Sequence, residues 1–242
     1  MKKILFLIFF LLLWFLISHF KLLPPIVLPN PIDVIQSARF QLLTGALTTT
    51  SRAIAGFLIG ILLSYLFHFL CVAFKVEQAM DAQFAGMRAV PVIAVMPLFV
   101  IWFGFSETGR LLIVILSAVV FFIAPLHESY KLLGRDWTIL RDQLSLNTFS
   151  YYLHIVAPGT FGSLLGPLRV ALAVAFTISI ASEYIGAQTG IGKVLDAARV
   201  TFNVPAIILT ILIASIIGVC LDKITTALYT KFIKWAGKQG KT

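Results

Sequence analysis

The stretch from Ile139 to Arg169, ILRDQLSLNTFSYYLHIVAPGTFGSLLGPLR, is the longest polar interruption between the strongly apolar segments of this chain. Its apolar residues have roughly helical spacing, and the pair Pro158-Gly159 follows them. This pattern predicts a short amphipathic helix, a break at Pro158-Gly159 and then a new helix. In a chain this apolar, such a segment is expected to lie outside the bilayer, either as a loop or as a docking surface for a soluble partner.

Composition places the rest of the chain in a lipid bilayer. Of its 242 residues, 60% are hydrophobic and 12% are charged, whereas soluble domains have about 45–50% apolar and about 25% charged residues. Once the apolar runs are assigned to the membrane, too little chain remains for a soluble catalytic domain. We therefore expect an integral membrane protein without enzymatic activity or cofactor. The net charge of +9 is attributed to cytoplasmic loops rather than to nucleic-acid binding.

Six apolar runs are predicted to cross the membrane as helices, which makes the chain an all-α polytopic membrane protein. The first run follows two lysines and has no small-x-small cleavage site, so it is expected to be retained. A short amphipathic helix at 33–43, a tight turn at 106–110 and a Gly-rich polar loop at 183–203 are expected between the runs. Within a single transmembrane domain, 1–242, the predicted spans are residues 4–20, 53–74, 89–105, 111–127, 164–182 and 204–221.

The distribution of the 19 basic residues predicts which ends of the spans are cytoplasmic. With the N-terminus inside, 13 of them lie on the cytoplasmic side: Lys2, Lys3, Lys75, Arg88, Lys131, Arg135, Arg141, Arg169, Lys223, Lys231, Lys234, Lys238 and Lys241. The other six lie outside: Lys21, Arg39, Arg52, Arg110, Lys193 and Arg199. Because cytoplasmic loops carry the excess of Lys and Arg, both termini and segment 135–160 are predicted to be cytoplasmic.

Sequence motifs of catalytic, metal and nucleotide sites are not found. The four histidines, at positions 19, 68, 127 and 154, form no metal-binding pair, although His68 is expected to hydrogen-bond a neighbouring helix. Residues 187–194, AQTGIGKV, approach a P-loop, but an alanine replaces its first glycine and Val194 replaces the hydroxyl residue that contacts magnesium. We predict no catalytic residue, no metal and no bound nucleotide.

The fifth predicted span carries a cluster of hydroxyl and small residues. Thr177, Ser179 and Ser182 alternate with several alanines. Such residues mark close packing between membrane helices, and they also suit a helix that lines a pore, so both interpretations stay open. On the second interpretation, Thr177, Ser179 and Glu183 are candidates for the translocation path.

Several motifs resemble those of the inner-membrane permease subunits of bacterial binding-protein-dependent ABC importers. The likeness is greatest to the group for nitrate, taurine and aliphatic sulfonates, with relatives assigned to thiamine-precursor pyrimidines, and it covers residues 28–235. The matching elements are Leu28-Pro29-Asn30-Pro31; Arg52, Gly56 and Phe57; Pro91, Ala94, Pro97-Leu98 and Trp102-Phe103-Gly104; and Glu183 followed by Gly190-Ile191-Gly192.

These permeases carry a cytoplasmic loop with the pattern E-A-A-x3-G-x9-I-x-L-P. At the end of this pattern Ile155 and Pro158 match, with Ala157 in place of the leucine, whereas Ile139-Leu140-Arg141 stands at E-A-A and Ser145 at the glycine. A turn is still expected at Ser145-Leu146-Asn147, because Ser and Asn side chains satisfy local backbone groups and Asn tolerates a left-handed conformation. The resemblance implies that 139–158 docks on an ATPase, with Arg141 and Asp142 as a polar rim. The implied coupling residues are Ser145, Leu146, Asn147, Phe149, Ile155 and Pro158.

The resemblance implies a type I ABC importer permease core in the bacterial inner membrane. Its expected partners are cytoplasmic ABC ATPase subunits, an extracytoplasmic solute-binding protein and a second permease subunit, as a homodimer. The implied solute is a small anion or a heteroaromatic nutrient. The alternative is a stand-alone secondary transporter or channel, which predicts charges at the midplane or inverted repeats.

Overall fold

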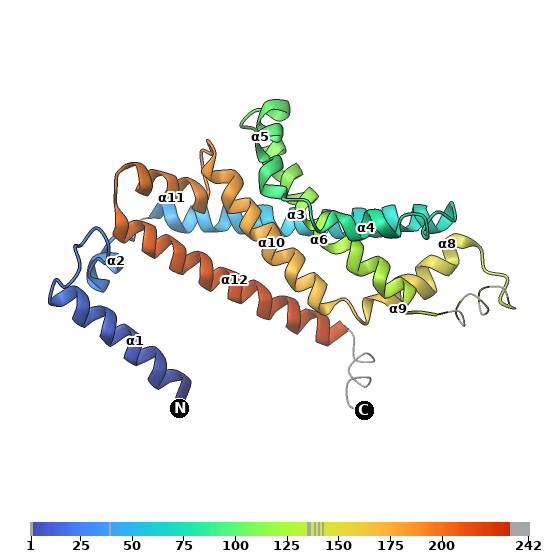
Figure 1. Cartoon of the computed structure of the whole chain (residues 1–242), viewed down its shortest axis with the longest axis horizontal. Coiled ribbons are helices and arrows are strands. Elements are labelled where there is room, and N and C mark those ends of the chain that lie inside the picture. The colour runs from blue at the N-terminus through green and yellow to red at the C-terminus, as the bar shows by residue number, and fades with distance from the viewer. Residues whose placement is uncertain are drawn as a thin grey trace. The chain divides into compact units, whose positions relative to one another are not determined.

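The computed structural model describes residues 2–38, 40–134, 137, 139, 141 and 143–232, and the regular elements among these residues are all helices. They form two compact units, which are described separately. The first unit comprises Met1–Thr49 and Glu183–Ile217, and the second comprises Thr50–Ser182 and Gly218–Thr242. Figure 1 labels the helices in chain order.

Four helices in the described part of the chain are long and apolar enough to cross a membrane. They are α3 (Phe40–Ala73), α6 (Glu107–Lys131), α10 (Leu165–Tyr184) and α12 (Val204–Phe232). The bent pair α4 (Asp81–Met87) and α5 (Val92–Phe103) makes a fifth if it is counted as one span. The chain is therefore an all-helical, multi-pass membrane protein. Helix α1 (Lys2–His19) is not among the four, and the count of six spans stays a prediction.

The long helices extend beyond the predicted spans. Helix α3 has 34 residues, which corresponds to about 51 Å at 1.5 Å per residue, well above the ~30 Å hydrocarbon layer. Arg52 does not open this span as predicted but lies inside it, with 6% of its surface exposed. Its guanidinium is paired with the Glu107 carboxylate at 2.6 Å. Because a partner compensates the charge, an arginine can lie within the helix.

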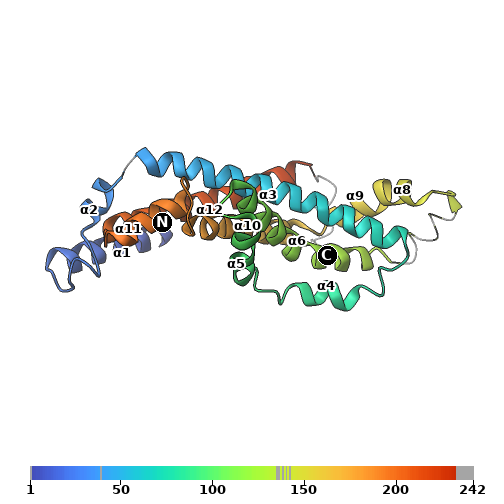
Figure 2. The ribbon, with the colours of Figure 1, turned by 90° about the horizontal axis from the view of Figure 1, so that it is seen from above.

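The third predicted span, residues 89–105, is shorter and bent. Helix α5 has only 12 residues and meets α4 at 87°, and Figure 1 shows α5 turned away from the direction of α4. Helix α4 packs against α6 (Figure 2). The break lies at residues 88–91, where a proline without an N–H and the restricted residue before it disfavour a continuous helix. The stretch between the predicted spans 53–74 and 89–105 thus contains a helix, α4.

A turn, a loop and a short helix that the sequence predicts are also different in the structure. Ser106 caps α6 by accepting a hydrogen bond from the Gly109 N–H at 3.1 Å, so the predicted turn at 106–110 is the first turn of a helix. The expected loop at 183–203 contains α11 (Ile191–Val200), whose apolar side is buried. The helix expected at 33–43 is divided into α2 (Pro31–Gln36), capped by Asn30, and the start of α3.

In the second unit, α3 and α6 approach closely along a stripe of small residues. Gly56, Gly60 and Ser64 recur every four residues on α3 and therefore share a face. A Cβ added at Gly56 would lie 2.5 Å from Val114 Cγ1, and one added at Gly60 would lie 2.5 Å from Ala118 Cβ. This spacing is the small-xxx-small pattern that lets membrane helices pack backbone to backbone. His68 continues the same stripe by one more turn and is fully buried.

We expect Gly60→Leu to destabilise the second unit by about 1–3 kcal/mol, because the added side chain overpacks the contact with α6. The measurement is the thermal unfolding midpoint of the purified chain in detergent. Gly218→Ala is the matched control, since a Cβ there meets nothing within 4 Å. An unchanged midpoint for Gly60→Leu would contradict the close approach of α3 and α6.

Candidate functional site

The segment that the sequence singled out forms a continuous helical rod in its second half. Helix α8 (Thr148–Tyr151) passes into a π-helical turn, η1 (Tyr152–Val156), and then into α9 (Ala157–Phe161). The predicted break at Pro158-Gly159 is therefore wrong. Pro158 has no N–H to donate to the carbonyl four residues earlier, and the wider turn at η1 accommodates this lost bond. The chain leaves the helix at Gly162-Ser163 instead.

A turn lies where the sequence predicts it, but a different residue takes the left-handed conformation. Ser145, at the position of the family's glycine, has φ +51°. Asn147 is extended, with φ −67° and ψ 161°, and its side-chain oxygen accepts a hydrogen bond from the Ser150 N–H at 2.7 Å. Asn147 thus caps α8. A non-glycine residue with positive φ is uncommon and often marks a functional turn.

One face of the segment packs inward within the second unit. Tyr151, Tyr152, Ile155 and Val156 form a buried cluster with Val72 of α3. Leu146 is half-buried against the same cluster. Burial raises the pKa of the Tyr151 and Tyr152 phenols, so both hydroxyls keep their protons at physiological pH. Of the predicted coupling residues, Leu146 and Ile155 therefore hold the segment onto the unit.

The opposite face of the segment is apolar and exposed. Phe149 is 62% exposed, and Leu144 and Leu153 are more than half exposed. Pro158 is exposed as well and, together with His154, lines a groove of about 580 Å³ at the end of α6. Contiguous exposed apolar side chains mark interaction surfaces in proteins. The structure thus divides the predicted coupling residues into an inner set and an outer set.

The predicted polar rim is described only in part. The Arg141 guanidinium lies over the Tyr151 ring, 5.4 Å from its centroid, and its Nη2 is 3.5 Å from the Thr148 hydroxyl. Arg141 therefore stacks on the segment itself. Asp142, Arg135 and Leu140 lie outside the residues that the structure describes.

A second site lies in the first unit, around a fully buried carboxylate. Glu183 Oε2 accepts hydrogen bonds from the Thr49 hydroxyl at 2.7 Å and from the Gly192 N–H at 3.0 Å. Thr49 Oγ1 in turn accepts from the Ile191 N–H at 2.8 Å. The first N–H groups of α11 are thus bound by a carboxylate and a hydroxyl, as the helix dipole favours. We call Thr49, Glu183 and Gly190–Gly192 the Glu183 clasp.

Two glycines make the clasp possible. Gly190 has φ +121°, and a Cβ there would overlap the Glu183 carboxylate. A Cβ on Gly45 of α3 would lie 2.9 Å from the Gly190 carbonyl carbon. The sequence showed the Glu183 and Gly190-Ile191-Gly192 motif but not its partners, which are about 140 residues away in the chain at Gly45 and Thr49. Gly45 and Thr49 lie four residues apart on one face of α3, but this local pattern does not indicate Glu183 as their partner.

The other candidates for the translocation path are placed differently on α10. Thr177 is exposed and donates a hydrogen bond to the Ala173 carbonyl at 2.9 Å, whereas Ser179 is fully buried. Residues two positions apart face different sides of a helix. Thr177 and Ser179 therefore do not form one polar face, and the structure does not bring the three candidates together.

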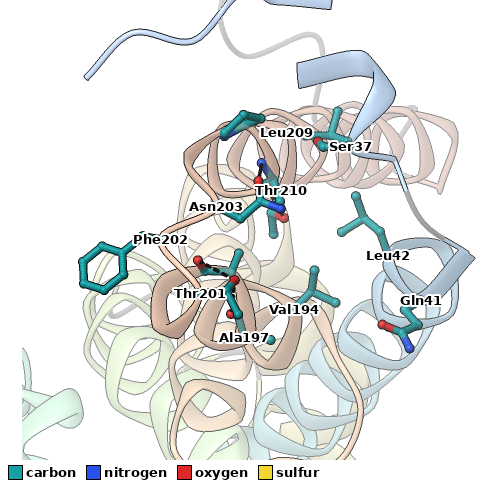
Figure 3. Close-up of a pocket in the computed structure, with 13 residues that line it drawn as sticks. Ser37, Gln41, Leu42, Val194, Ala197, Thr201, Phe202, Asn203, Leu209 and Thr210 are labelled. Atoms are coloured by element: carbon teal, nitrogen blue, oxygen red, sulfur yellow. Dashed lines mark hydrogen bonds between the residues drawn. The ribbon is translucent and has the colours of Figure 1, made fainter. Parts of the chain in front are cut away.

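The first unit also contains an open pocket of about 560 Å³ (Figure 3), lined by the start of α3, by α11 and by the start of α12. Its lining combines amide and hydroxyl groups, from Gln41, Asn203 and Thr210, with apolar side chains such as Leu42 and Leu209. None of the lining residues is charged. Thr177, Ser179 and Glu183 do not line this pocket.

The helices described above define the class of the chain as a polytopic helical membrane protein. No protein-family model matches the chain. The putative aliphatic sulfonates transport permease SsuC of Bacillus subtilis is 26% identical over 92% of this chain and 83% of its own length. The formylaminopyrimidine transport permease ThiX of Halalkalibacterium halodurans is 26% identical over 89% of this chain and 88% of its own. A probable ABC transporter permease of Brucella melitensis is 23% identical over 87% and 88%.

The likeness to these relatives extends over nearly the whole chain and agrees with the resemblance predicted from its motifs. The chain is a homologue of ABC transporter permease subunits. Such subunits are membrane components of transport and not enzymes, as the sequence predicts for this chain.

Proposed function

We propose that the chain is the permease subunit of a bacterial ABC importer in the inner membrane, with six spans and a type I importer core. Two copies form the pathway, cytoplasmic ATPase subunits drive it, and an extracytoplasmic binding protein delivers the solute. The observation that carries this proposal is the outer face of 139–158, where an exposed Phe149 follows a left-handed turn at Ser145. A connector that contacts only solvent does not need exposed aromatic and aliphatic side chains.

In this proposal the segment is the element that transmits movement of the ATPases. Phe149 and the neighbouring exposed leucines contact the ATPase, while the inner face, including Tyr152 and Ile155, holds the segment on the second unit. A movement of the segment is then transferred to α3 and α6, because its inner face is packed on them. Alternating access requires ATP binding to favour one of two discrete states of the permease.

The solute class rests on the relatives alone. Their names refer to aliphatic sulfonates and to formylaminopyrimidine, so a small anion or a heteroaromatic nutrient is the proposed solute. Thr177, Ser179 and Glu183 remain the proposed positions along the path, although Ser179 and Glu183 are buried. The alternative, a stand-alone secondary transporter or channel, requires no ATPase.

The proposed topology predicts opposite accessibility for two positions. In a background with Cys71 and Cys220 replaced by alanine, Ser150→Cys should react with a membrane-impermeant thiol reagent only after the cells are opened. Gln188→Cys, at an exposed position before α11, should react in intact cells. The measurement is labelling of each variant before and after permeabilisation. Labelling of Ser150→Cys from outside would contradict a cytoplasmic coupling segment.

A further inference from the structure

The pocket in the first unit lies between three elements that are far apart in the chain. Its walls are the start of α3, α11 with the turn after it, and the start of α12 (Figure 3). Its volume of about 560 Å³ lies within the roughly 300–1,000 Å³ of small-molecule sites in proteins. Leu42 is buried on the α3 side, whereas the Phe202 ring points away from the other labelled side chains in Figure 3. The pocket is therefore large enough for a small organic molecule.

The described walls of this pocket provide no positive charge for an anion. None of the lining residues is charged. Arg199, in the last turn of α11, does not line the pocket; its guanidinium is paired with the Asp196 carboxylate at 2.9 Å and lies over the Tyr184 ring, 5.5 Å from the ring centroid. An anion that leaves water needs a cation or several hydrogen-bond donors in exchange. Side chains of the described pocket do not supply the cation.

The start of α12 does not supply the donors either. Helix N-termini bind anions through N–H groups that have no partner inside the helix. Here the Val204 N–H donates to the Phe202 carbonyl at 3.0 Å. Pro205 has no N–H, and the Ala206 N–H donates to Asn203 Oδ1 at 3.2 Å. The end of α11, which lines the same pocket, adds the negative end of its dipole. The pocket therefore favours an uncharged ligand over an anion.

The polar side chains of the pocket offer both donors and acceptors to such a ligand. Because Asn203 Oδ1 accepts the Ala206 N–H, the orientation of the Asn203 amide is set, and its Nδ2 amino group has two protons to donate. The Thr210 hydroxyl donates to the Ala206 carbonyl at 2.6 Å, and the Thr201 hydroxyl donates to the Ala197 carbonyl at 2.9 Å. Since both hydroxyl protons are used within the helices, the two hydroxyl oxygens act as acceptors toward a ligand.

We propose that this pocket binds a small, uncharged heteroaromatic molecule, such as a pyrimidine, and discriminates against anions. The faces of a planar heterocycle are apolar and fit the walls made by Leu42, Val194 and Leu209. Its edge carries donors and acceptors, which bond to Asn203 and to the threonine hydroxyls and fix its orientation. That this ligand is the transported solute rests on the proposed function, whereas binding to the chain requires neither an ATPase nor transport, so that the two can fail separately.

The test compares two probes on the purified full-length chain, held in nanodiscs of uncharged lipid at neutral pH without an ATPase. Cytosine is the uncharged heteroaromatic probe, and ethanesulfonate is the anionic probe. The measurement is saturation-transfer difference nuclear magnetic resonance, titrated with each probe to obtain its Kd. Cytosine should bind saturably, and ethanesulfonate should bind at least about tenfold more weakly, because the pocket does not compensate its charge. A lack of saturable cytosine binding, or equal affinity for ethanesulfonate, would overturn the proposal.

A first variant tests whether cytosine occupies this pocket. Ala197 is an exposed residue on the α11 wall, so Ala197→Leu narrows the pocket without overpacking a core. Cytosine binding should weaken at least about tenfold, which corresponds to the loss of about one good contact. Ala227→Leu is the matched control, because it makes the same change at an exposed alanine of α12 that does not line the pocket. Wild-type affinity in Ala197→Leu would place cytosine elsewhere and contradict the proposal.

A second variant tests the polar contact. Asn203→Ser retains a side-chain oxygen that can cap α12 but removes the amino group that donates to the ligand. The thermal unfolding midpoint should stay at the wild-type value, while the affinity for cytosine should fall about tenfold, as expected for one lost hydrogen bond to a ligand. An unchanged affinity in this variant would show that Asn203 does not contact the ligand and would contradict the proposed binding mode.

Discussion

Gly190→Ala is expected to reduce the amount of folded, membrane-inserted protein by at least about tenfold. The residue has φ +121°, and its Cβ would overlap the buried Glu183 carboxylate. Backbone strain at such a position costs about 1–3 kcal/mol, and each ~1.4 kcal/mol corresponds to a factor of ten. The carboxylate has little room to withdraw, because it accepts hydrogen bonds from Thr49 and Gly192. The measurement is the yield of monodisperse protein on gel filtration after detergent extraction.

Two comparisons isolate the cause of this loss. Gly104→Ala places an alanine at φ +62° with nothing within 4 Å of the added Cβ, so it carries backbone strain without overlap. It should lose clearly less protein. Combining Gly190→Ala with Glu183→Ala should cost less than the sum of the single changes, because the overlap disappears. Additive losses in this double-mutant cycle would mean that Glu183 and Gly190 are not in contact.

Phe149→Asp is expected to weaken ATPase binding by about 2 kcal/mol or more, or ~30-fold, because a central aromatic anchor of an interface is replaced by a charge. The side chain is 62% exposed, so the permease itself should fold normally. The measurement is the amount of ATPase retained on washed membranes, together with the ATP hydrolysis of the purified complex. Both should fall, while the permease is inserted at the wild-type level.

The matched control is Phe74→Asp, which makes the same change at a 74% exposed phenylalanine just beyond α3. It lies on the predicted cytoplasmic side but outside the coupling segment, so ATPase binding should be unaffected. Leu146→Asp is not a suitable test of ATPase binding. Leu146 packs against the inner cluster, so a charge there disturbs the segment itself. Equal losses for Phe149→Asp and Phe74→Asp would rule out a specific contact at Phe149.

The sequence predicted the class of fold because that class depends on composition and on hydrophobic runs. It misplaced helix ends where a partner compensates a charge. The charge of Arg52 predicts the end of a span, whereas its pairing with Glu107 lets the helix continue through it. The bend between α4 and α5 was missed because prolines within a membrane helix are often tolerated, and sequence alone does not tell which one interrupts the helix.

The sequence predicts those parts of the candidate sites whose residues are close together in the chain. The turn at Ser145 was predicted from the spacing of the family's motif, but which residue takes the positive φ depends on the cap that Asn147 supplies to α8. The Glu183 clasp joins residues that are far apart in the chain, such as Thr49 and Glu183, and the buried contact between His68 and His127 does the same. Without a defined packing of the helices, no local pattern indicates such pairs.

The central claim is that an ABC ATPase docks on the outer face of 139–158. The most direct measurement is photo-crosslinking in living cells, with a photoreactive phenylalanine analogue at position 149 and, as the comparison, at position 74. Our account predicts an adduct between the chain and an ABC ATPase subunit at position 149 and none at position 74. Absence of an ATPase adduct at position 149, from a chain that also purifies without any ATPase, would contradict it and favour a stand-alone transporter or channel.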